Sequence, residues 1–247
     1  MTELRVLPVE GLPEIADGDR LGELVAARAE LEAGDVVVFS QKVVSKAEGR
    51  VVDLSSVQAS DRAVQLAADL GKDAALVQLV LDESSEVIRA ERGVLICETR
   101  HGLVCANAGV DTSNVGDGKA ALLPLDPDAS ARRIRSELRD ASGVPVAVVV
   151  ADSFGRAWRQ GQSEVAIGCA GLRPLDDWRG RTDAAGKALT ATLIAVADEA
   201  AGAADLVRDK SSQIPSAVVR GLAQHVTEDD GPGAIAIRRS RDEDLFR

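Results

Sequence analysis

Short continuous apolar runs recur along the chain, and each run ends in polar or turn-forming residues. A run of this kind is typical of a strand that is buried on both faces. We therefore predict strands over residues 4–9, 36–39, 146–151, 166–172 and 217–219. The run at 146–151 is the most apolar, and Asp152 follows it directly. We place Asp152 at the carboxyl end of that strand, where open sheets usually bind ligands.

Segments with apolar residues at helical spacing lie between these runs. Asp126, followed by Pro127 and Asp128, is a strong helix start, and Ile134 and Leu138 give this helix its buried face. Four further helices are predicted: one capped by Asp19 with apolar residues up to Leu31, one from Ser60 to Gly71, one over 73–84 and one long helix over 184–207. The polar and charged tail over 228–247 is expected to be loosely held.

A hairpin centred on His101 is predicted between paired strands over 87–97 and 103–107. This pairing would place Cys97 opposite Cys105. The chain has an odd number of cysteines, 3, which points to a reducing compartment, so we expect facing thiols and no bridge. His101 would lie at the hairpin tip, and no second histidine nearby supports a role as a metal ligand.

The composition narrows the classes of function. A net charge of −11 argues against nucleic acid as the main partner. No apolar run is long enough to span a membrane and the N-terminus lacks a signal-peptide pattern, so we expect a cytoplasmic protein. An anionic substrate would need metal ions or a basic cluster to approach so acidic a chain. The arginines that offer such a cluster, with a solvated face as the alternative, are Arg156, Arg159, Arg173, Arg179 and Arg181.

The stretch over 105–114 combines small side chains with oxygen-bearing ones, among them Asp111 and Asn114. Small side chains let a backbone approach a ligand closely, and carboxylate oxygens suit hard cations. Alone, this composition is more typical of a turn. Asp152 also follows a buried apolar run, and the two carboxylates together predict a metal–phosphate site. Lys46 stands just past buried structure, where either a phosphate-binding or a solvent-facing lysine would lie.

The usual nucleotide and catalytic signatures are missing from the sequence. No P-loop occurs, and G-D-G-K-A-A at 116–121 only imitates a dinucleotide loop, because no clear strand precedes it and no clear helix follows. The patterns G-x-S-x-G, C-x-x-C and H-E-x-x-H are absent as well. Residue patterns therefore predict a phosphate-handling enzyme that uses a divalent metal, and they go no further.

Six longer motifs appear together and in order. They are P-V-E-G-L-P at 8–13, S-K-A-E-G-R at 45–50, E-T-R-H-G-L-V-C-A-N-A-G-V-D-T-S-N-V at 98–115, L-L-P-L-D-P-D-A-S-A at 122–131, D-S-F-G-R-A-W-R-Q-G at 152–161 and V-A-D-E-A-A at 196–201. On these motifs the chain resembles the coenzyme F420-0:L-glutamate ligase family over nearly its whole length. The resemblance implies one ligase domain over 1–247, an α+β monomer of two subdomains with mixed or antiparallel sheets and flanking helices, and an intertwined homodimer.

The resemblance also implies a reaction. L-glutamate is added to the deazaflavin precursor coenzyme F420-0, giving F420-1 and γ-linked F420-2 or longer, while GTP is split to GDP and phosphate. A divalent cation, Mg²⁺ or Mn²⁺, is implied as the cofactor, with K⁺ as a further candidate. Relatives often continue into a flavin-binding, nitroreductase-like domain after a segment similar to D-E-D-L-F-R. This sequence stops there, so we expect no such domain.

The family's site residues carry over to three overlapping sets of positions. Metal ligands are implied at Asp111, Asp152 and Ser153, and catalytic roles at Asp111, Asp152 and Lys46. Nucleotide contacts are implied at Glu10, Gly11, Leu12, Pro13, Gln41, Lys46 and Asn114, and in the loop over 206–213. Gln41 stands where some relatives carry a small hydroxyl residue, and Ser153 keeps the hydroxyl of the more common threonine. No Cys, Ser or Lys lies in a context that activates a covalent nucleophile, which favours an acyl phosphate on the substrate.

Alternatives remain at the level of the sequence. Trp158 or Trp178 would stack on the deazaflavin or pack in the core, and Asp198 and Glu199 would orient the glutamate amine or form a charged pair on a helix face. Two other classes of function stay open. A metal-dependent phosphotransferase or GTP hydrolase acting on another small carboxylic acid would turn over without glutamate. A non-catalytic nucleotide-binding module would bind GTP without turnover.

Overall fold

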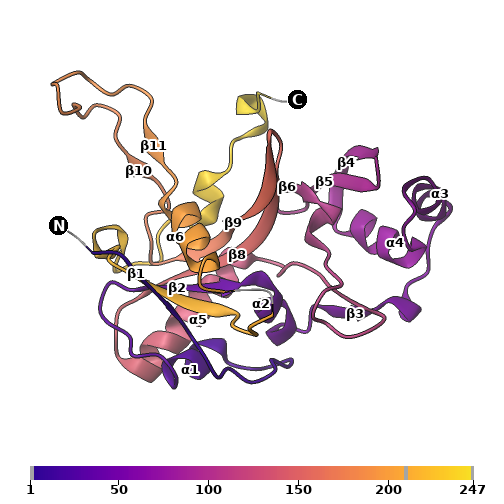
Figure 1. Ribbon diagram of the computed structural model, residues 1–247, viewed down its shortest axis with the longest axis horizontal. Helices are drawn as coiled ribbons and strands as arrows, with labels where there is room; N and C mark the ends of the chain where they lie inside the picture. The colour runs from indigo at the N-terminus through magenta and orange to yellow at the C-terminus, as the bar shows by residue number, and fades with distance from the viewer. Residues whose placement is uncertain (1–2, 209–210, 246–247) are drawn as a thin grey trace.

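The computed structural model describes residues 3–208 and 211–245, and it has the helices and paired strands of an α+β protein (Figure 1). The strands are β1 (Arg5–Pro8), β2 (Val36–Ser40), β3 (Val51–Asp53), β4 (Ser84–Glu91), β5 (Val94–Thr99), β6 (Val104–Ala106), β7 (Lys119–Ala121), β8 (Ala147–Arg156), β9 (Arg159–Ala170), β10 (Asp176–Asp177), β11 (Leu193–Ile194) and β12 (Ser216–Arg220). The α-helices are α1 (Leu21–Ala26), α2 (Gln41–Ala47), α3 (Asp61–Leu70), α4 (Ala74–Asp82), α5 (Pro127–Ser142) and α6 (Val196–Asp205).

The larger part of the molecule is built on a mixed five-stranded sheet with the order β1-β12-β2-β8-β9. Only β2 and β8 run parallel in it, and the other neighbours are antiparallel. Val37 and Phe39 pack on one face with α1 and α5, whereas Val36 and Val38 pack on the other face with α6. Because β2 is buried on both faces, its sequence is continuously apolar, as predicted.

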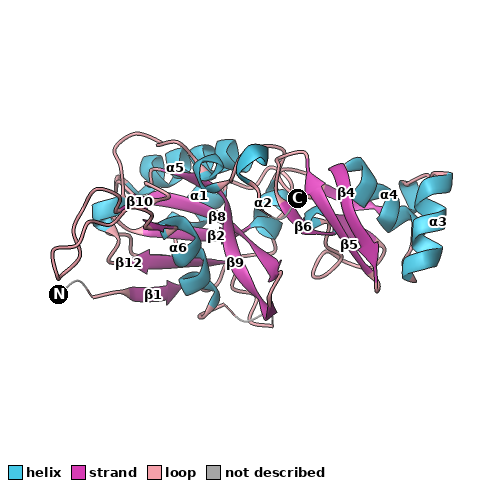
Figure 2. Ribbon diagram, turned by 90° about the horizontal axis from the view of Figure 1, so that it is seen from above, coloured by secondary structure: helices cyan, strands magenta, loops and turns pink. Residues whose placement is uncertain are grey.

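The smaller part lies beside this sheet (Figures 1 and 2) and has a core of its own. Its antiparallel sheet β4-β5-β6 and its helices α3 and α4 enclose Leu95 and Val77, which are fully buried. β3 and β7 form a separate two-stranded sheet. Cys97 and Cys105 are register partners on β5 and β6, and both are buried free thiols, which confirms the predicted arrangement.

Helix boundaries agree with the local signals at three of the predicted helices. The carboxylate of Asp126 accepts a hydrogen bond from the backbone N–H of Ala129 at 2.9 Å, as an N-cap should. The hydroxyl of Ser60 caps α3, which ends at Gly71 with φ 65°, a left-handed conformation that glycine adopts without strain. Asp73 caps α4 through the N–H of Leu76.

Two helix predictions are wrong. Asp19 does not cap α1; its carboxylate accepts the N–H of Ala16 instead, and α1 ends at Ala26, well before Leu31. The predicted helix over 184–207 is helical only in α6. Before it, Asp183 accepts two backbone N–H groups and Gly186 has φ 84°, so the chain turns there instead of continuing a helix.

The strand predictions need three corrections. The segment over 87–97 is not one strand, because Arg92 and Gly93 form a left-handed turn that separates β4 from β5. β8 continues five residues beyond the predicted end at 151, and β9 begins at Arg159 instead of 166. Asp152 therefore lies inside a long hairpin and not at a strand end. Pairing with β9 supplies the hydrogen bonds that keep this polar segment extended.

The C-terminal tail, as far as the structure describes it, is held to the body, contrary to the prediction. The buried guanidinium of Arg135 donates hydrogen bonds to the carbonyls of Thr227, Glu228 and Asp229. Further along, Ala234 is buried, and its N–H donates to the Asp128 carboxylate. Within the described ranges, no helix is long and apolar enough to cross a membrane.

Candidate active site

Asp111 and Asp152 come from different parts of the molecule, and their charges interact. Asp111 follows β6 and forms an isolated antiparallel bridge with Ala121 of β7. Asp152 lies on β8 just beyond the last residue pair that β8 makes with β2, Ala151 and Ser40. The negative charge of Asp111 acts on Asp152 and helps to raise its pKa, so the two carboxylates lie close enough to interact.

The pKa of Asp152 is raised from 3.8 to about 7. Burial is the largest cause, because a charged carboxylate loses its hydration there. The negative charges of Glu164 and Asp111 act in the same direction. A carboxylate held among like charges in a partly dry site is one that a bound cation would stabilise in its ionised form.

Asp111 has a different environment. Its carboxylate accepts the N–H of Ser113 at 2.8 Å and the hydroxyl of Ser113 at 2.9 Å. The ammonium of Lys42 on α2 lies 2.7 Å from Oδ2 of the same carboxylate. Although burial opposes ionisation, these hydrogen bonds hold the pKa of Asp111 below its usual value.

Ser153 points away from Asp152, because successive side chains of a strand lie on opposite faces. Val148 and Val150 lie on the same face of β8 as Asp152 and pack with α1 and α5. Val149 and Ala151 lie on the same face as Ser153 and pack with α6. Ser153 is the register partner of Glu164 on β9, and its hydroxyl donates to Glu164 Oε1 at 2.5 Å. Glu164 Oε2 lies 3.4 Å from the buried guanidinium of Arg208, which follows α6.

The donor set suits a hard divalent cation, since every candidate ligand offers oxygen. Among the described residues, no group of three or more His, Cys, Asp and Glu side chains is arranged to hold a metal ion. A cation here would rely on Asp111 and Asp152, completed by water and by phosphate oxygens of a substrate. That arrangement is common for Mg²⁺, which is bound through one or two carboxylates and keeps several waters.

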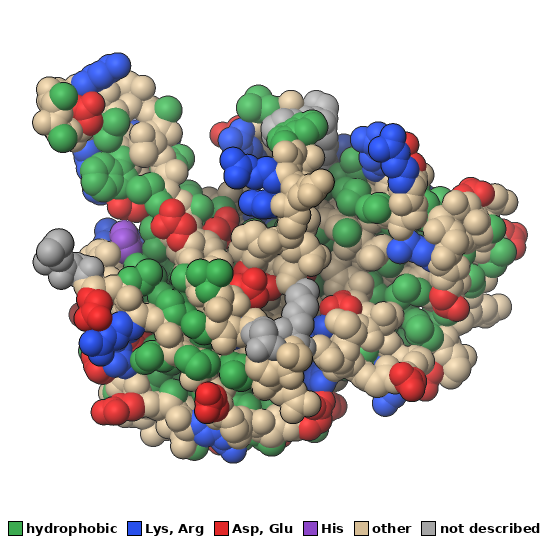
Figure 3. Space-filling view, in the orientation of Figure 1, with side chains coloured by type: hydrophobic (Ala, Val, Ile, Leu, Met, Phe, Trp, Pro, Cys, Tyr) green, Lys and Arg blue, Asp and Glu red, His purple; other side chains and the backbone are tan. Residues whose placement is uncertain are grey.

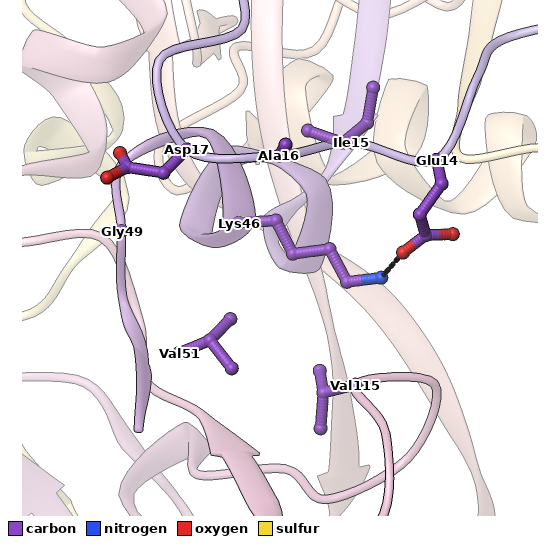
Figure 4. Close-up of a pocket in the computed structure, with 8 residues that line it drawn as sticks. All are labelled: Glu14, Ile15, Ala16, Asp17, Lys46, Gly49, Val51 and Val115. Atoms are coloured by element: carbon purple, nitrogen blue, oxygen red, sulfur yellow. Dashed lines mark hydrogen bonds and ion pairs between the residues drawn. The ribbon is translucent and has the colours of Figure 1, made fainter. Parts of the chain in front are cut away.

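A pocket of about 350 Å³ opens beside α2 (Figure 4). Its lining residues come from the segment before α1, from α2 and the residues after it, and from the loop after Asp111; they are Glu14, Ile15, Ala16, Asp17, Lys46, Gly49, Val51 and Val115. The ammonium of Lys46 donates to the Glu14 carboxylate at 2.5 Å and is only 15% exposed as a side chain. A lysine in such a pocket presents a point charge suited to phosphate oxygens.

Most of the predicted nucleotide contacts lie next to this pocket in the chain. Glu10, Gly11, Leu12 and Pro13 directly precede Glu14, and Asn114 directly precedes Val115. Gln41 is different, because its side chain is buried and its carbonyl oxygen accepts the Ser45 hydroxyl within α2. In the predicted loop over 206–213, residues 209 and 210 lie outside the described part of the chain.

The five predicted arginines do not form one cluster. Arg156 and Arg159 lie at the turn of the β8–β9 hairpin, whereas Arg179 and Arg181 belong to the arm formed by residues 176–194. Figure 3 shows the arm standing away from the body, with hydrophobic and basic side chains on it. Arg179 forms an ion pair with Asp177, and Arg181 forms one with Asp176 of the same arm. These aspartates offset much of the positive charge of the two arginines.

The remaining candidates have structural surroundings. Trp158 is 80% exposed at the hairpin turn, and Trp178 is half-buried under Arg181, whose Cζ lies 4.9 Å from the ring centre. Neither packs in the core. Asp198 accepts the N–H of Ala166 on β9 at 2.9 Å, which ties α6 to the sheet. His101 lies at the β5–β6 hairpin, as predicted, and its Nε2 lies 3.1 Å from the carbonyl oxygen of Leu125.

Sequence reasoning missed Lys42, Ser113, Glu164 and Arg208. Lys42 and Lys46 are one turn apart on α2 and therefore share a face of it, so a predicted helix over 41–47 would have pointed to Lys42. That helix was not predicted, because it follows β2 without a break. Glu164 and Arg208 carry no local signal at all, since their partners are far away in the chain.

Comparisons with known proteins agree over almost the whole sequence. The family described as F420-0:Gamma-glutamyl ligase matches residues 11–221. The chain is 41% identical to the Coenzyme F420:L-glutamate ligase of Methanothermobacter thermautotrophicus, with 99% of each chain covered. It is 44% identical to the protein of that name from Archaeoglobus fulgidus, over 99% of this chain and 96% of the other. For Methanopyrus kandleri the identity is 43%, over 99% and 98%.

Proposed function

Since the chain belongs to the F420-0:gamma-glutamyl ligase family, we propose that it is the enzyme that joins L-glutamate to coenzyme F420-0, with GTP as the energy source. Relatives with the name Coenzyme F420:L-glutamate ligase are 39–44% identical to this chain, and the alignments cover them almost from end to end. Two observations support the proposal. The charges of Asp111 and Asp152 interact, and the loop after Asp111 lines the Lys46 pocket through Val115. A cation held by these carboxylates would then be available to a phosphate group bound by Lys46.

The chemistry requires an activated carboxyl group. Amide formation from a carboxylate and an amine needs a better leaving group than oxide, and transfer of the γ-phosphoryl group of GTP to the carboxylate supplies it. A carboxylate oxygen of the acceptor forms the new P–O bond and GDP leaves. The amine of glutamate then attacks the acyl carbon, phosphate leaves with its electron pair, and the amine loses a proton to form the amide.

The residues of the chain support this direct route. Burial raises the pKa of the Cys105 thiol to about 12, and the nearby charge of Asp152 adds to the effect. The thiol is therefore protonated at neutral pH and is not a nucleophile. Lys46 would bind phosphate oxygens of the nucleotide from the pocket, with Glu14 holding its ammonium in place. Glu10, Gly11, Leu12, Pro13 and Asn114 would line the same nucleotide site.

A divalent cation, Mg²⁺ or Mn²⁺, fits the oxygen ligands of Asp111 and Asp152. When bound, it would offset the charge of the phosphates and of the incoming carboxylate. The task of the chain is to hold its ligands: Ser113 fixes the orientation of the Asp111 carboxylate, and β8–β9 pairing fixes Asp152. Because Ser153 lies on the other side of β8, its hydroxyl oxygen would ligate a cation there, with Glu164 accepting its proton.

The working unit is proposed to be a homodimer. Two projections leave the body, the β8–β9 hairpin and the arm, and both expose large apolar side chains: Trp158 is 80% exposed and Leu193 is 44% exposed. On association, a partner protein would cover these exposed apolar side chains. A second copy of this chain is the proposed partner, with the hairpin and the arm reaching across.

One assay tests the proposed function. Purified protein is incubated with coenzyme F420-0, L-glutamate, GTP and Mn²⁺, and the products are read by mass spectrometry. We expect glutamate additions and one GDP for each. With glutamate omitted, hydroxylamine should trap a hydroxamate of the precursor, and labelled carboxylate oxygen should appear in the released phosphate. Retention of all label in the amide product and water would rule out the acyl phosphate, and GTP turnover that ignores glutamate would favour a phosphotransferase or hydrolase.

A further inference from the structure

Lys42 occupies the place beside Asp111 where a cation would be expected. Its ammonium lies 2.7 Å from Asp111 Oδ2 and donates to the Ser113 hydroxyl at 2.6 Å. The side chain is only 16% exposed. Its positive charge also acts on Asp152 and favours the ionised form of that carboxylate, so the ammonium interacts with both carboxylates that the proposed cation would use.

The contacts leave little room for a second cation at Asp111. Oδ2 already accepts the ammonium of Lys42 and the hydroxyl of Ser113, and Oδ1 accepts the N–H of Ser113. A divalent ion that took Oδ2 would sit within contact distance of the ammonium. Two positive charges that close repel strongly in a partly buried site, so an ion at Oδ2 and the Lys42 contact exclude each other.

We propose that Lys42 is a resident counter-cation, which balances Asp111 and Asp152 in the metal-free protein and is displaced when a divalent cation binds. This rests on the proposed function for the identity of the cation. Lys42 lies one turn from Lys46 on the same face of α2, the side on which Lys46 reaches the pocket. The displaced ammonium is therefore at hand to bind a phosphate oxygen of the nucleotide, next to Lys46.

Two roles for Lys42 are compared: a cation that exchanges with the metal, and one half of a purely structural ion pair. They predict opposite changes in Mn²⁺ affinity when Lys42 is removed. The ion pair joins α2 of the larger part to the loop after β6, so a purely structural lysine would keep Asp111 in position. Its removal would then leave Mn²⁺ affinity unchanged or weaken it. A lysine that competes with the metal has the reverse effect, because its removal frees Asp111 and removes a repelling charge.

The experiment measures Mn²⁺ binding by isothermal titration calorimetry without nucleotide, in the full chain and in Lys42→Met. We expect the variant to bind Mn²⁺ about tenfold more tightly and to have a raised KM for GTP and a lowered kcat. Lys42→Gln serves as a second variant in case the methionine disturbs folding. Lys119→Met is the control, because it removes an exposed lysine from β7 in the smaller part, and it should bind Mn²⁺ as the unsubstituted chain does.

Unchanged or weaker Mn²⁺ binding in both folded Lys42 variants would overturn the inference, as would a lack of Mn²⁺ binding in the unsubstituted chain. The ligase assay separates this outcome from failure of the proposed function. Tighter Mn²⁺ binding in a protein that does not join glutamate to coenzyme F420-0 would support the exchange and refute the ligase. Glutamate ligation by the unsubstituted chain, with no gain of Mn²⁺ affinity in the Lys42 variants, would support the ligase and refute the exchange.

Discussion

The hydroxyl of Ser153 donates a hydrogen bond to the Glu164 carboxylate, 2.5 Å away across the β8–β9 hairpin. The two residues are register partners, so the strand pairing itself brings them together. Because the Ser153 hydroxyl directs its proton at Glu164, its oxygen lone pairs would be the atoms that coordinate the cation in the proposed function. Arg208 balances the second oxygen of Glu164.

Ser153→Ala should weaken Mn²⁺ binding and lower turnover by about 10- to 100-fold, the usual cost of disturbing a metal ligand or its supporting hydrogen bond. Ser153→Thr keeps the hydroxyl and should behave nearly as the unsubstituted chain does. Calorimetric titration with Mn²⁺ and steady-state rates check both variants. Equal Mn²⁺ affinity in the alanine and threonine variants would show that this oxygen is no ligand.

Asp111→Asn and Asp152→Asn should each abolish metal-dependent turnover while the fold is kept. An amide keeps the shape of the carboxylate but removes the charge that a divalent cation needs. Rates measured over a range of Mn²⁺ concentrations, together with circular dichroism, test this. If either variant turned over normally at low Mn²⁺ concentration, that residue would have to be removed from the site.

The raised pKa of Asp152 predicts how stability changes with pH in the metal-free protein. Because the folded-state pKa is about 7, above the ordinary 3.8, the folded chain holds this proton more tightly than the unfolded chain. The resulting stabilisation is present below about pH 4 and is lost as pH rises through about 7.

The side chain of Asp152→Asn cannot ionise, so this variant should not lose stability as the pH rises through about 7. With a chelator present, the variant should gain stability over the unsubstituted chain between pH 5 and 8, by a few kcal/mol at most on the order-of-magnitude scale of about 1.4 kcal/mol per pKa unit. Urea unfolding of both proteins at pH 5 and at pH 8 gives the two free energies of unfolding to compare. A difference between the two proteins that does not change with pH would refute the assignment.

Gly168 on β9 should tolerate no side chain. A Cβ there would lie 2.2 Å from the backbone oxygen of Pro127, the first residue of α5. Gly168→Ala must push α5 off the sheet and should cost about 2 kcal/mol or more in unfolding free energy. Gly155→Ala is the matched control, since a Cβ on Gly155 of β8 meets nothing within 4 Å. Similar urea midpoints for the two variants would contradict this account.

The proposed homodimer has a direct test. Light scattering at micromolar concentration should give twice the chain mass of 25.8 kDa. The reason is that dimer formation would bury the exposed apolar side chains of the hairpin and arm. Trp158→Ser should shift the equilibrium toward monomer, since aromatic anchors carry a large share of interface energy. A monomer mass for the unsubstituted chain at these concentrations would rule the dimer out.

The sequence by itself determined the parts that depend on near neighbours in the chain. The apolar runs of β2 and β8, the Asp126 cap of α5 and the glycine end of α3 are all set by residues within one or two turns. The pairing of Cys97 with Cys105 followed from a short hairpin. Asp111 and Asp152 stood out for the same reason, as carboxylates placed after apolar runs.

Only the tertiary structure decided how these pieces meet. The polar residues beyond Ala151 stay extended because β9 returns alongside them, which places Ser153 against Glu164. The same packing brings Asp152 within the electrostatic influence of Asp111. The contact of Lys42 with Asp111 joins residues 69 positions apart. No local pattern contains such contacts, because their free energy comes from burial and charge that exist only after distant segments have packed together.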